Sequence, residues 1–330
     1  MRKHLLRLLT VVMLASLLSG CGGQNAANGS GTISIVSTIF PPYDWTRQIL
    51  GDHADDAELT LLLGNGVDLH SYQATAADIV AISHCDLLIY VGGDSDAWVE
   101  DAWNAAANPH GIAVNLMDVL GDAVKAEELI EGMESDGHGE HDEHGGEHDG
   151  EAESDEHVWL SLRNAQTLCT YIADRLGETD AANAAAYKAN AQTYNTELSA
   201  LDAEYRAAVR DAQRETLLFA DRFPFRYLLD DYGLTYYAAF PGCSAETEAS
   251  FETIVFLAEK VEELQLKTIM VSETSDKSLA ETVLRSTADP NRKILVWDSL
   301  QSVGVSDVSS GESYLSIMKR NLDVLKEALR

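Results

Sequence analysis

Residues 87–91 read Leu-Leu-Ile-Tyr-Val, an unbroken apolar run between Asp86 and the turn Gly92-Gly93. Continuous apolar runs of this length are typical of strands buried on both faces, as in a parallel sheet. The flanking segments, residues 74–83 and 98–107, have helical patterns. A strand that alternates with helices in this way predicts an α/β domain with a parallel sheet.

The same alternation runs through the first part of the chain. We expect strands over residues 32–38, 57–63, 87–91 and 112–116, and a further helix over residues 44–50. Pro41-Pro42 should stop the first strand, because proline cannot donate to a ladder of hydrogen bonds. Together these elements predict a first α/β lobe over residues 32–180.

The second half repeats the pattern and predicts a second α/β lobe over residues 213–330. Its expected strands are 217–220, 235–240, 268–271 and 294–297, and its helices are 225–232, 251–264, 277–287 and 314–329. Between the lobes, residues 181–212 carry apolar or aromatic side chains along one helical face. A helix of about 30 residues spans roughly 45 Å, so we expect a rigid strut between the lobes. A long surface helix is the alternative.

The N-terminus has the pattern of a secretion signal. Met1-Arg2-Lys3 and Arg7 are followed by the short apolar segment 8–18, and then by Leu18-Ser19-Gly20-Cys21. This last motif resembles a bacterial lipobox. We therefore expect residues 1–20 to be a signal peptide, Cys21 to carry a lipid that anchors the protein, and residues 21–31 to form a flexible tether. An ordinary signal peptide with a chance cysteine is the alternative.

Charge and cysteine content narrow the classes of function. The first 20 residues hold three bases and no acid, so their removal takes the net charge from −31 to −34. Such acidity excludes nucleic acid and anionic membrane surfaces as partners and suits a protein that attracts cations. Three cysteines remain after Cys21, without a CxxC pair, which argues against a disulfide scaffold or a zinc ribbon. Cys85 and Cys169 either pair or are buried free thiols.

Residues 132–156 form a tract rich in His, Asp, Glu and Gly, in which His138, His141, His144 and His148 are irregularly spaced. We expect a solvated, disordered loop, because the tract has little to bury and repels itself. Imidazole and carboxylate also bind divalent metals, so the loop would act as a weak metal collector. A solubilising acidic linker is the alternative. Apolar order resumes at His157-Val158-Trp159-Leu160.

Polar residues that follow predicted strands are the remaining site candidates, because ligands of open α/β sheets bind beyond the carboxyl ends of strands. They are His70, Asp221, Arg222, Glu273 and Asp298.

The chain resembles the zinc- and manganese-binding lipoproteins that serve as substrate-binding proteins of bacterial ABC metal importers. The resemblance covers nearly the whole mature chain, and the order and spacing of its motifs are more specific than any one motif. The motifs are Phe40-Pro41-Pro42-Tyr43, Ile49-Leu50-Gly51-Asp52, Asp68-Leu69-His70-Ser71-Tyr72, His157-Val158-Trp159-Leu160, Phe225-Arg226-Tyr227-Leu228 and Trp297-Asp298-Ser299-Leu300.

The resemblance implies a metal site in the cleft between two lobes that one long helix joins. His70 and His157 would be ligands from the first lobe, and Asp298 a carboxylate ligand from the second. It also implies that the protein is a monomer held by the lipid on Cys21 outside the cell membrane, and that it passes the metal to an ABC permease.

One position departs from the family's pattern. The third ligand, His or Glu in the family, lies three residues before the aromatic residue matched by Phe225, and this chain has Arg222 there. A guanidinium cannot bind a cation, and all ten histidines lie at or before His157. Asp221 is the nearest substitute, and Arg222 would pair with Asp221 or Glu273. We expect Glu273 to support the site rather than bind metal, and Cys243 to be a packed thiol.

We therefore expect high-affinity capture of a divalent transition metal and no enzymatic activity. Zinc is favoured over manganese, because zinc binds more tightly at equal concentration and a His-rich collector suits it. The lack of a third histidine argues for manganese. A surface adhesin or metal buffer without a permease, and a secreted metallohydrolase, are the rivals.

Overall fold

The first sheet is built around β1 (Ile33–Ser37), whose residues 35–37 are buried. The structure is a computed structural model, and it describes residues 32–106, 108–134, 153–244 and 248–330. Cys21 and the four histidines of the acidic tract lie outside these ranges. The strands run parallel in the order β2-β1-β3-β4, with β2 at Ala57–Leu61, β3 at Leu87–Tyr90 and β4 at Ile112–Asn115.

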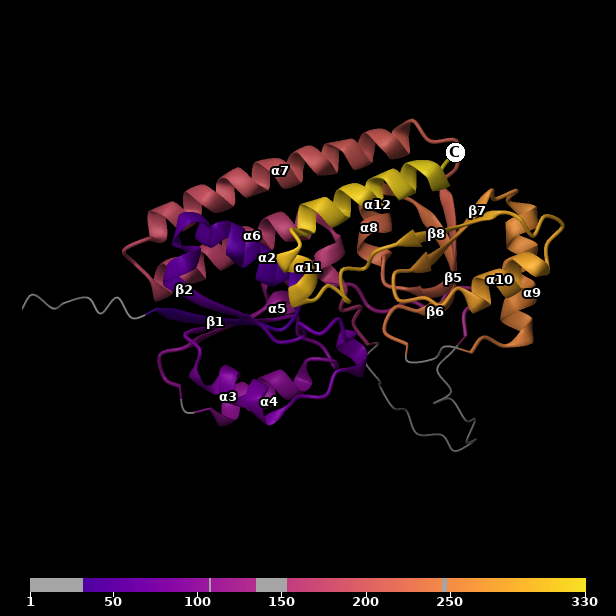
Figure 1. Cartoon of the computed structure of the whole chain (residues 1–330). Coiled ribbons are helices and arrows are strands. Elements are labelled where there is room, and N and C mark those ends of the chain that lie inside the picture. Colours follow the sequence, from indigo (N-terminus) through magenta and orange to yellow (C-terminus); the bar gives the residue numbers. More distant parts are fainter. Residues whose placement is uncertain (1–31, 107, 135–152, 245–247) are drawn as a thin grey trace, which may run out of the picture. The chain divides into compact units, whose positions relative to one another are not determined.

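Helices flank this sheet, as the alternating pattern predicts (Figure 1). They are α2 (Phe40–Leu50), α3 (Ala76–His84), α4 (Ala97–Ala105), the short α5 (Leu116–Leu120) and α6 (Leu162–Thr179). The expectation for Pro41-Pro42 needs a correction. These prolines lie in the first turn of α2, directly after Phe40, where a missing N–H costs nothing and the fixed φ favours the helix.

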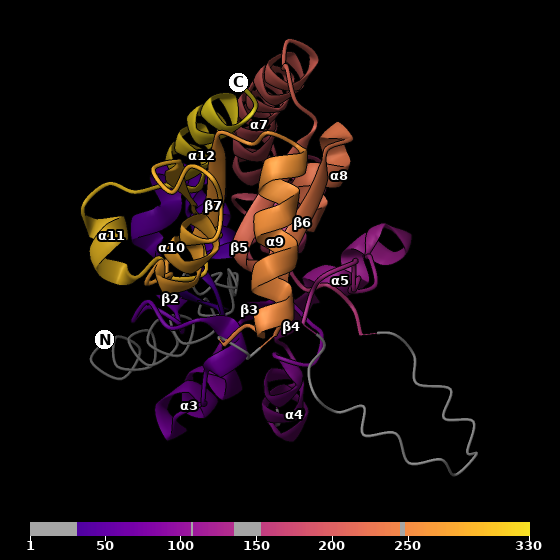
Figure 2. The ribbon, with the colours of Figure 1, turned by 90° about the vertical axis from the view of Figure 1, so that its right-hand side faces the viewer.

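The second sheet has the same topology, in the order β6-β5-β7-β8. Its strands are β5 (Thr216–Phe223), β6 (Thr235–Pro241), β7 (Thr268–Ser272) and β8 (Lys293–Trp297). Its helices are α8 (Arg226–Tyr232), α9 (Phe251–Glu263), α10 (Ser278–Arg285), the short α11 (Val305–Ser309) and α12 (Tyr314–Ala328). Figure 2 shows α9 and α10 along this sheet. The predicted fold class, two parallel sheets flanked by helices, is confirmed.

The predicted long helix is α7 (Ala184–Arg210), 27 residues or about 40 Å long. It packs against α2 and α6, which flank the first sheet, and against α12, which flanks the second (Figure 1). Its buried face holds Tyr187, Ala191, Tyr194, Leu198, Leu201 and Tyr205. Both sheets thus share one continuous helical support.

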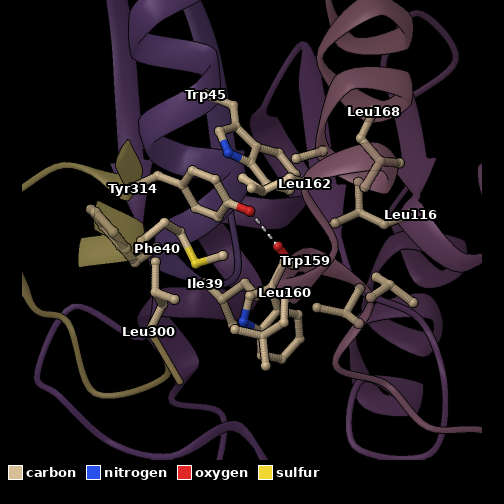
Figure 3. Close-up of a cluster of buried hydrophobic side chains, with 14 of the residues drawn as sticks. Ile39, Phe40, Trp45, Leu116, Trp159, Leu160, Leu162, Leu168, Leu300 and Tyr314 are labelled. Carbon is tan, nitrogen blue, oxygen red and sulfur yellow. Dashed lines mark hydrogen bonds between the residues drawn. The ribbon is translucent and has the colours of Figure 1, made fainter. Parts of the chain in front are cut away.

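A cluster of large apolar side chains gathers around Trp159 and Leu160 (Figure 3). Trp45 and Tyr314 meet edge to face with ring centroids 5.2 Å apart, and Trp159 and Leu160 lie beside them, fully buried. The Tyr314 hydroxyl donates a 2.7 Å hydrogen bond to the Trp159 carbonyl. Burial of each such side chain contributes about 1.5–3 kcal/mol, so the segment that follows His157 is firmly held.

Candidate metal centre

The loop after β2 carries His70. Residues 69–71 form a single 3₁₀ turn, and Asp68 begins it by accepting a 2.9 Å hydrogen bond from the backbone N–H of His70. The Nδ1 atom of His70 lies 2.8 Å from the hydroxyl of Ser95, which comes after β3. Asp68 thus holds the backbone of His70 and Ser95 orients its ring, which leaves the Nε2 atom for another partner.

His157 is fully buried and is oriented by one carboxylate. Oδ1 of Asp155 accepts hydrogen bonds from the backbone N–H and from Nδ1 of His157, each 2.9 Å long. On the other side, the Trp159 ring lies 5.2 Å from the imidazole ring, and the Trp159 indole N–H donates to the Ser299 carbonyl at 2.9 Å. A carboxylate only accepts, so Nδ1 carries a proton, and Nε2 is the nitrogen through which this ring would bind a metal.

The two imidazoles face each other through these Nε2 atoms, which lie 3.1 Å apart. Two nitrogen ligands of a tetrahedral zinc ion, each bound at about 2.0–2.1 Å, are separated by about 3.3 Å. The spacing therefore already suits a metal ion. Asp155 plays the part that carboxylates play behind many metal-bound histidines, where they fix the tautomer and make the ligand more basic.

Burial keeps His70 neutral. Desolvation lowers the pKa of His70 to about 3, with a further contribution from the charge of His157. The neighbouring Asp68 acts in the opposite direction. A histidine with such a low pKa is uncharged at neutral pH and keeps one ring nitrogen unprotonated, which is the state that a metal ligand needs.

Glu156 lies behind His70. One carboxylate oxygen accepts the Ser95 backbone N–H at 2.9 Å, and the other, Oε2, has no hydrogen-bond partner among the described residues. This Oε2 atom is 3.6 Å from Nδ1 of His70. When Nε2 of His70 binds a metal, its ring proton must sit on Nδ1, where Ser95 and Glu156 both offer acceptor oxygens.

The carboxylates predicted from the second lobe have other partners. Asp221 accepts the backbone N–H and the hydroxyl of Ser272, at 3.0 and 2.7 Å. Asp298 accepts the Leu300 N–H at 2.8 Å, and Glu273 accepts the N–H and the hydroxyl of Ser299, both at 2.8 Å. Burial, with help from Glu273, raises the pKa of Asp298 to about 7. These contacts fasten the ends of the strands of the second sheet, and the ligand roles of Asp221 and Asp298 stay predictions.

Arg222 pairs with Asp68 instead of Asp221 or Glu273. Its Nη2 atom donates to Asp68 Oδ2 at 2.7 Å, and its Nη1 atom to the Ser244 carbonyl at 3.4 Å. The residue lies within β5, which continues to Phe223 with a shift of register, instead of following the strand as we expected. It links the second sheet to the loop of His70.

The structure brings one further potential ligand to the two histidines. Cys243 follows β6, and its Sγ atom lies within 4.8 Å of ligand atoms of His70 and His157. Among the described residues, neither Asp221 nor Asp298 belongs to this group. The position of Cys243 just beyond a predicted strand is the signal by which sequence reasoning could have ranked it higher. Cys85 and Cys169 are buried free thiols.

Comparisons with known proteins agree with this fold. The chain is 30% identical over 320 residues to the zinc-binding lipoprotein AdcA of Streptococcus pneumoniae serotype 4, and the match covers 97% of this chain but 60% of that protein. It is also 30% identical over 327 residues to the high-affinity zinc uptake system protein ZnuA of Bacillus subtilis, with 97% of both chains covered. Among solved structures, the Zn(II)-bound ZnuA-like domain of S. pneumoniae AdcA matches with a TM-score of 0.69 and 27% identity, over 91% of this chain and 99% of that one.

The chain thus spans about three fifths of the streptococcal relative and nearly all of the one from Bacillus. Residues 35–328 match the family described as zinc-uptake complex component A, periplasmic, which takes in both sheets and the histidine site. On this evidence the chain belongs to that zinc-uptake family.

Proposed function

We propose that the protein captures zinc outside the cytoplasm and delivers it to an ABC permease. His70 and His157 are the ligands from the first lobe. The supporting observation is the pair of Nε2 atoms 3.1 Å apart, each on a ring whose Nδ1 atom is already hydrogen-bonded. Two imidazoles held at this spacing bind a borderline metal without first having to be ordered.

Zinc fits this pair better than manganese. Imidazole nitrogen suits zinc, copper and nickel, whereas manganese is suited by carboxylate, carbonyl and water oxygens. The three carboxylates expected in the second lobe are hydrogen-bonded within that lobe. The relatives named for zinc point to the same cargo.

The anchor and the partner complete the proposal. A lipid on Cys21 holds a monomer at the outer face of the membrane, close to the permease that takes the ion. Within the described residues, we find no helix long and apolar enough to cross a membrane. The family is defined by zinc uptake instead of by a reaction, and the protein acts as a carrier without turnover.

The test is zinc affinity measured by competition with a chelator. His70→Ala and His157→Ala should each weaken zinc binding by at least about 100-fold, because loss even of an outer partner of a ligand costs 10–100-fold. His84→Ala is the matched control, since the one partner of its ring among the described residues is the Val80 carbonyl within α3. Unchanged affinity in the first two variants would refute the site. Hydrolysis of peptides or esters by the zinc-loaded protein would refute the carrier role.

The acidic tract can be tested separately. Deletion of residues 135–152 should leave one tight zinc site, because the proposed ligands His70 and His157 lie outside the deleted tract. The deletion has to end before Asp155, which orients His157. If it abolishes tight binding while His70→Ala does not, the zinc site lies in the tract.

A further inference from the structure

The second lobe meets the histidine pair through the loop after β6. Ligand atoms of His70, His157 and Cys243 all lie within 4.8 Å of one another. In a tetrahedral zinc site with bonds of about 2.3 Å to sulfur and 2.0–2.1 Å to nitrogen, sulfur and nitrogen are about 3.6 Å apart. A small movement of one side chain therefore closes the triangle around an ion.

Gly242 lets this loop approach the histidine. A Cβ atom at Gly242 would lie 2.9 Å from Cε1 of His157 and 2.9 Å from the Phe223 carbonyl oxygen. Neither neighbour can yield easily, since the imidazole is held by Asp155 and the carbonyl belongs to β5. Any larger residue at position 242 would push Cys243 away from the ring.

First-lobe groups also hold the backbone of Cys243. Glu127, which precedes the acidic tract, accepts the Cys243 N–H at 3.0 Å. The backbone of Glu156 hydrogen-bonds to the thiol, and this bond acts against the burial that raises the pKa of Cys243. Contacts from two segments of the other lobe are more than a packed thiol needs, because burial alone would satisfy it.

Arg222 stands at the position where the family has its third ligand, a histidine or a glutamate. Its guanidinium cannot bind a metal, and its ion pair with Asp68 anchors it beside the His70 loop. This ion pair links the two lobes whether or not a metal ion is bound. The second lobe holds no histidine, so its strongest zinc ligand near the pair is sulfur.

We propose that Cys243 is the metal ligand contributed by the second lobe, and that its sulfur joins His70 and His157 to form a site selective for zinc over manganese. This inference rests on the proposed function. A thiolate favours zinc and other soft or borderline ions, and it disfavours manganese. Three protein ligands leave a fourth tetrahedral position for water, through which the ion can be exchanged.

The experiment uses Co²⁺ as a probe for zinc in the full-length chain. Cobalt bound to a thiolate gives an intense near-ultraviolet charge-transfer absorption that cobalt bound to nitrogen and oxygen lacks. We expect this band in the unmodified protein and its loss in Cys243→Ser, with zinc affinity at least about 100-fold lower. Cys85→Ser is the matched control, because it replaces a buried free thiol that donates to the Ile82 carbonyl, and it should retain both the band and the affinity.

Each outcome separates the two proposals. Tight zinc binding without a thiolate band, or with unchanged affinity in Cys243→Ser, overturns the cysteine ligand and leaves the histidine site intact. Failure of the unmodified protein to bind zinc overturns the proposed function itself. Should Cys243→Ser not fold, alkylation of the unmodified protein decides: zinc should protect Cys243 from a maleimide, and equal labelling with and without zinc contradicts the proposal.

Discussion

The two lobes share one topology but supply the cleft in opposite ways. In the first lobe, polar residues beyond the strands orient two imidazoles and aim their Nε2 atoms at each other. In the second lobe, Glu273 and Asp298 follow strands and Asp221 lies within β5, and each of them accepts hydrogen bonds from its own lobe. A position after a strand is therefore not enough to make a ligand. The ligand atom must also be aimed at the shared site, as both Nε2 atoms are.

The largest expected effect concerns the packing under His157. Trp159→Ala should lower the free energy of unfolding by about 3–5 kcal/mol, as removal of a buried Trp side chain does. Zinc affinity should fall as well, because the ring beside the imidazole is lost. Trp297→Ala, in the second lobe, is matched in burial and should cost similar stability while the mutant retains its affinity for zinc. Chemical denaturation and chelator competition measure both quantities. Equal affinities in the two variants would remove the distinction between the lobes.

The next largest effect is expected from loss of the Asp155 carboxylate, which bonds to His157. Asp155→Ala should reduce zinc affinity by 10–100-fold, the usual cost of losing such a partner. Asp221→Asn should change it by less than about threefold, because Asp221 serves Ser272 and touches neither imidazole. Isothermal titration of both variants checks this. A larger loss in Asp221→Asn than in Asp155→Ala would place a ligand in the second lobe's carboxylates after all.

The pH dependence should report the second lobe's ligand. Burial, then the charges of Glu127 and Asp155, raise the pKa of the Cys243 thiol, so the metal-free thiol is protonated at neutral pH. Zinc must displace that proton, and the affinity should therefore rise about tenfold per pH unit between about pH 7 and 8.5. His70, with its pKa lowered to about 3, releases no proton in this range. The slope should flatten in Cys243→Ser, and an unchanged slope there would contradict a thiolate ligand.

The smallest effect is expected at the ion pair between the lobes. Arg222→Gln should weaken zinc binding by a few-fold, because Asp68 loses its 2.7 Å partner while still accepting the His70 N–H. A partly exposed ion pair of this kind contributes up to about 1 kcal/mol. Titration with zinc measures the change. A loss as large as that in His70→Ala would mean that Arg222 positions the imidazole.

Much of the fold was predictable because strands and helices alternate with few ambiguities. Runs such as residues 87–91 and 268–271 are buried strands in the structure, as continuous apolar runs are in parallel sheets. The bounds were less predictable. Pro41-Pro42 interrupt a strand pattern and start a helix with equal ease, and β5 continues past the point at which its apolar run ends.

In the candidate site, the two histidines were predictable from the sequence, but their partners were not. Each histidine is marked by its local sequence, since His70 follows a strand and His157 ends the acidic tract before an apolar run. The partner of Arg222 and the nearness of Cys243 depend on contacts between residues more than 80 positions apart. No local pattern encodes such contacts. Asp221 and Asp298 illustrate the same limit, because their hydrogen-bond partners appear only once the sheet is assembled.

The central claim is that one sulfur and two imidazole nitrogens hold the zinc ion. X-ray absorption at the zinc edge of the zinc-loaded protein tests it most directly, because sulfur and nitrogen scatter differently and at different distances. The expected result is one zinc–sulfur distance of about 2.3 Å together with nitrogen or oxygen neighbours at about 2.0–2.1 Å. A shell of nitrogen and oxygen alone would contradict it.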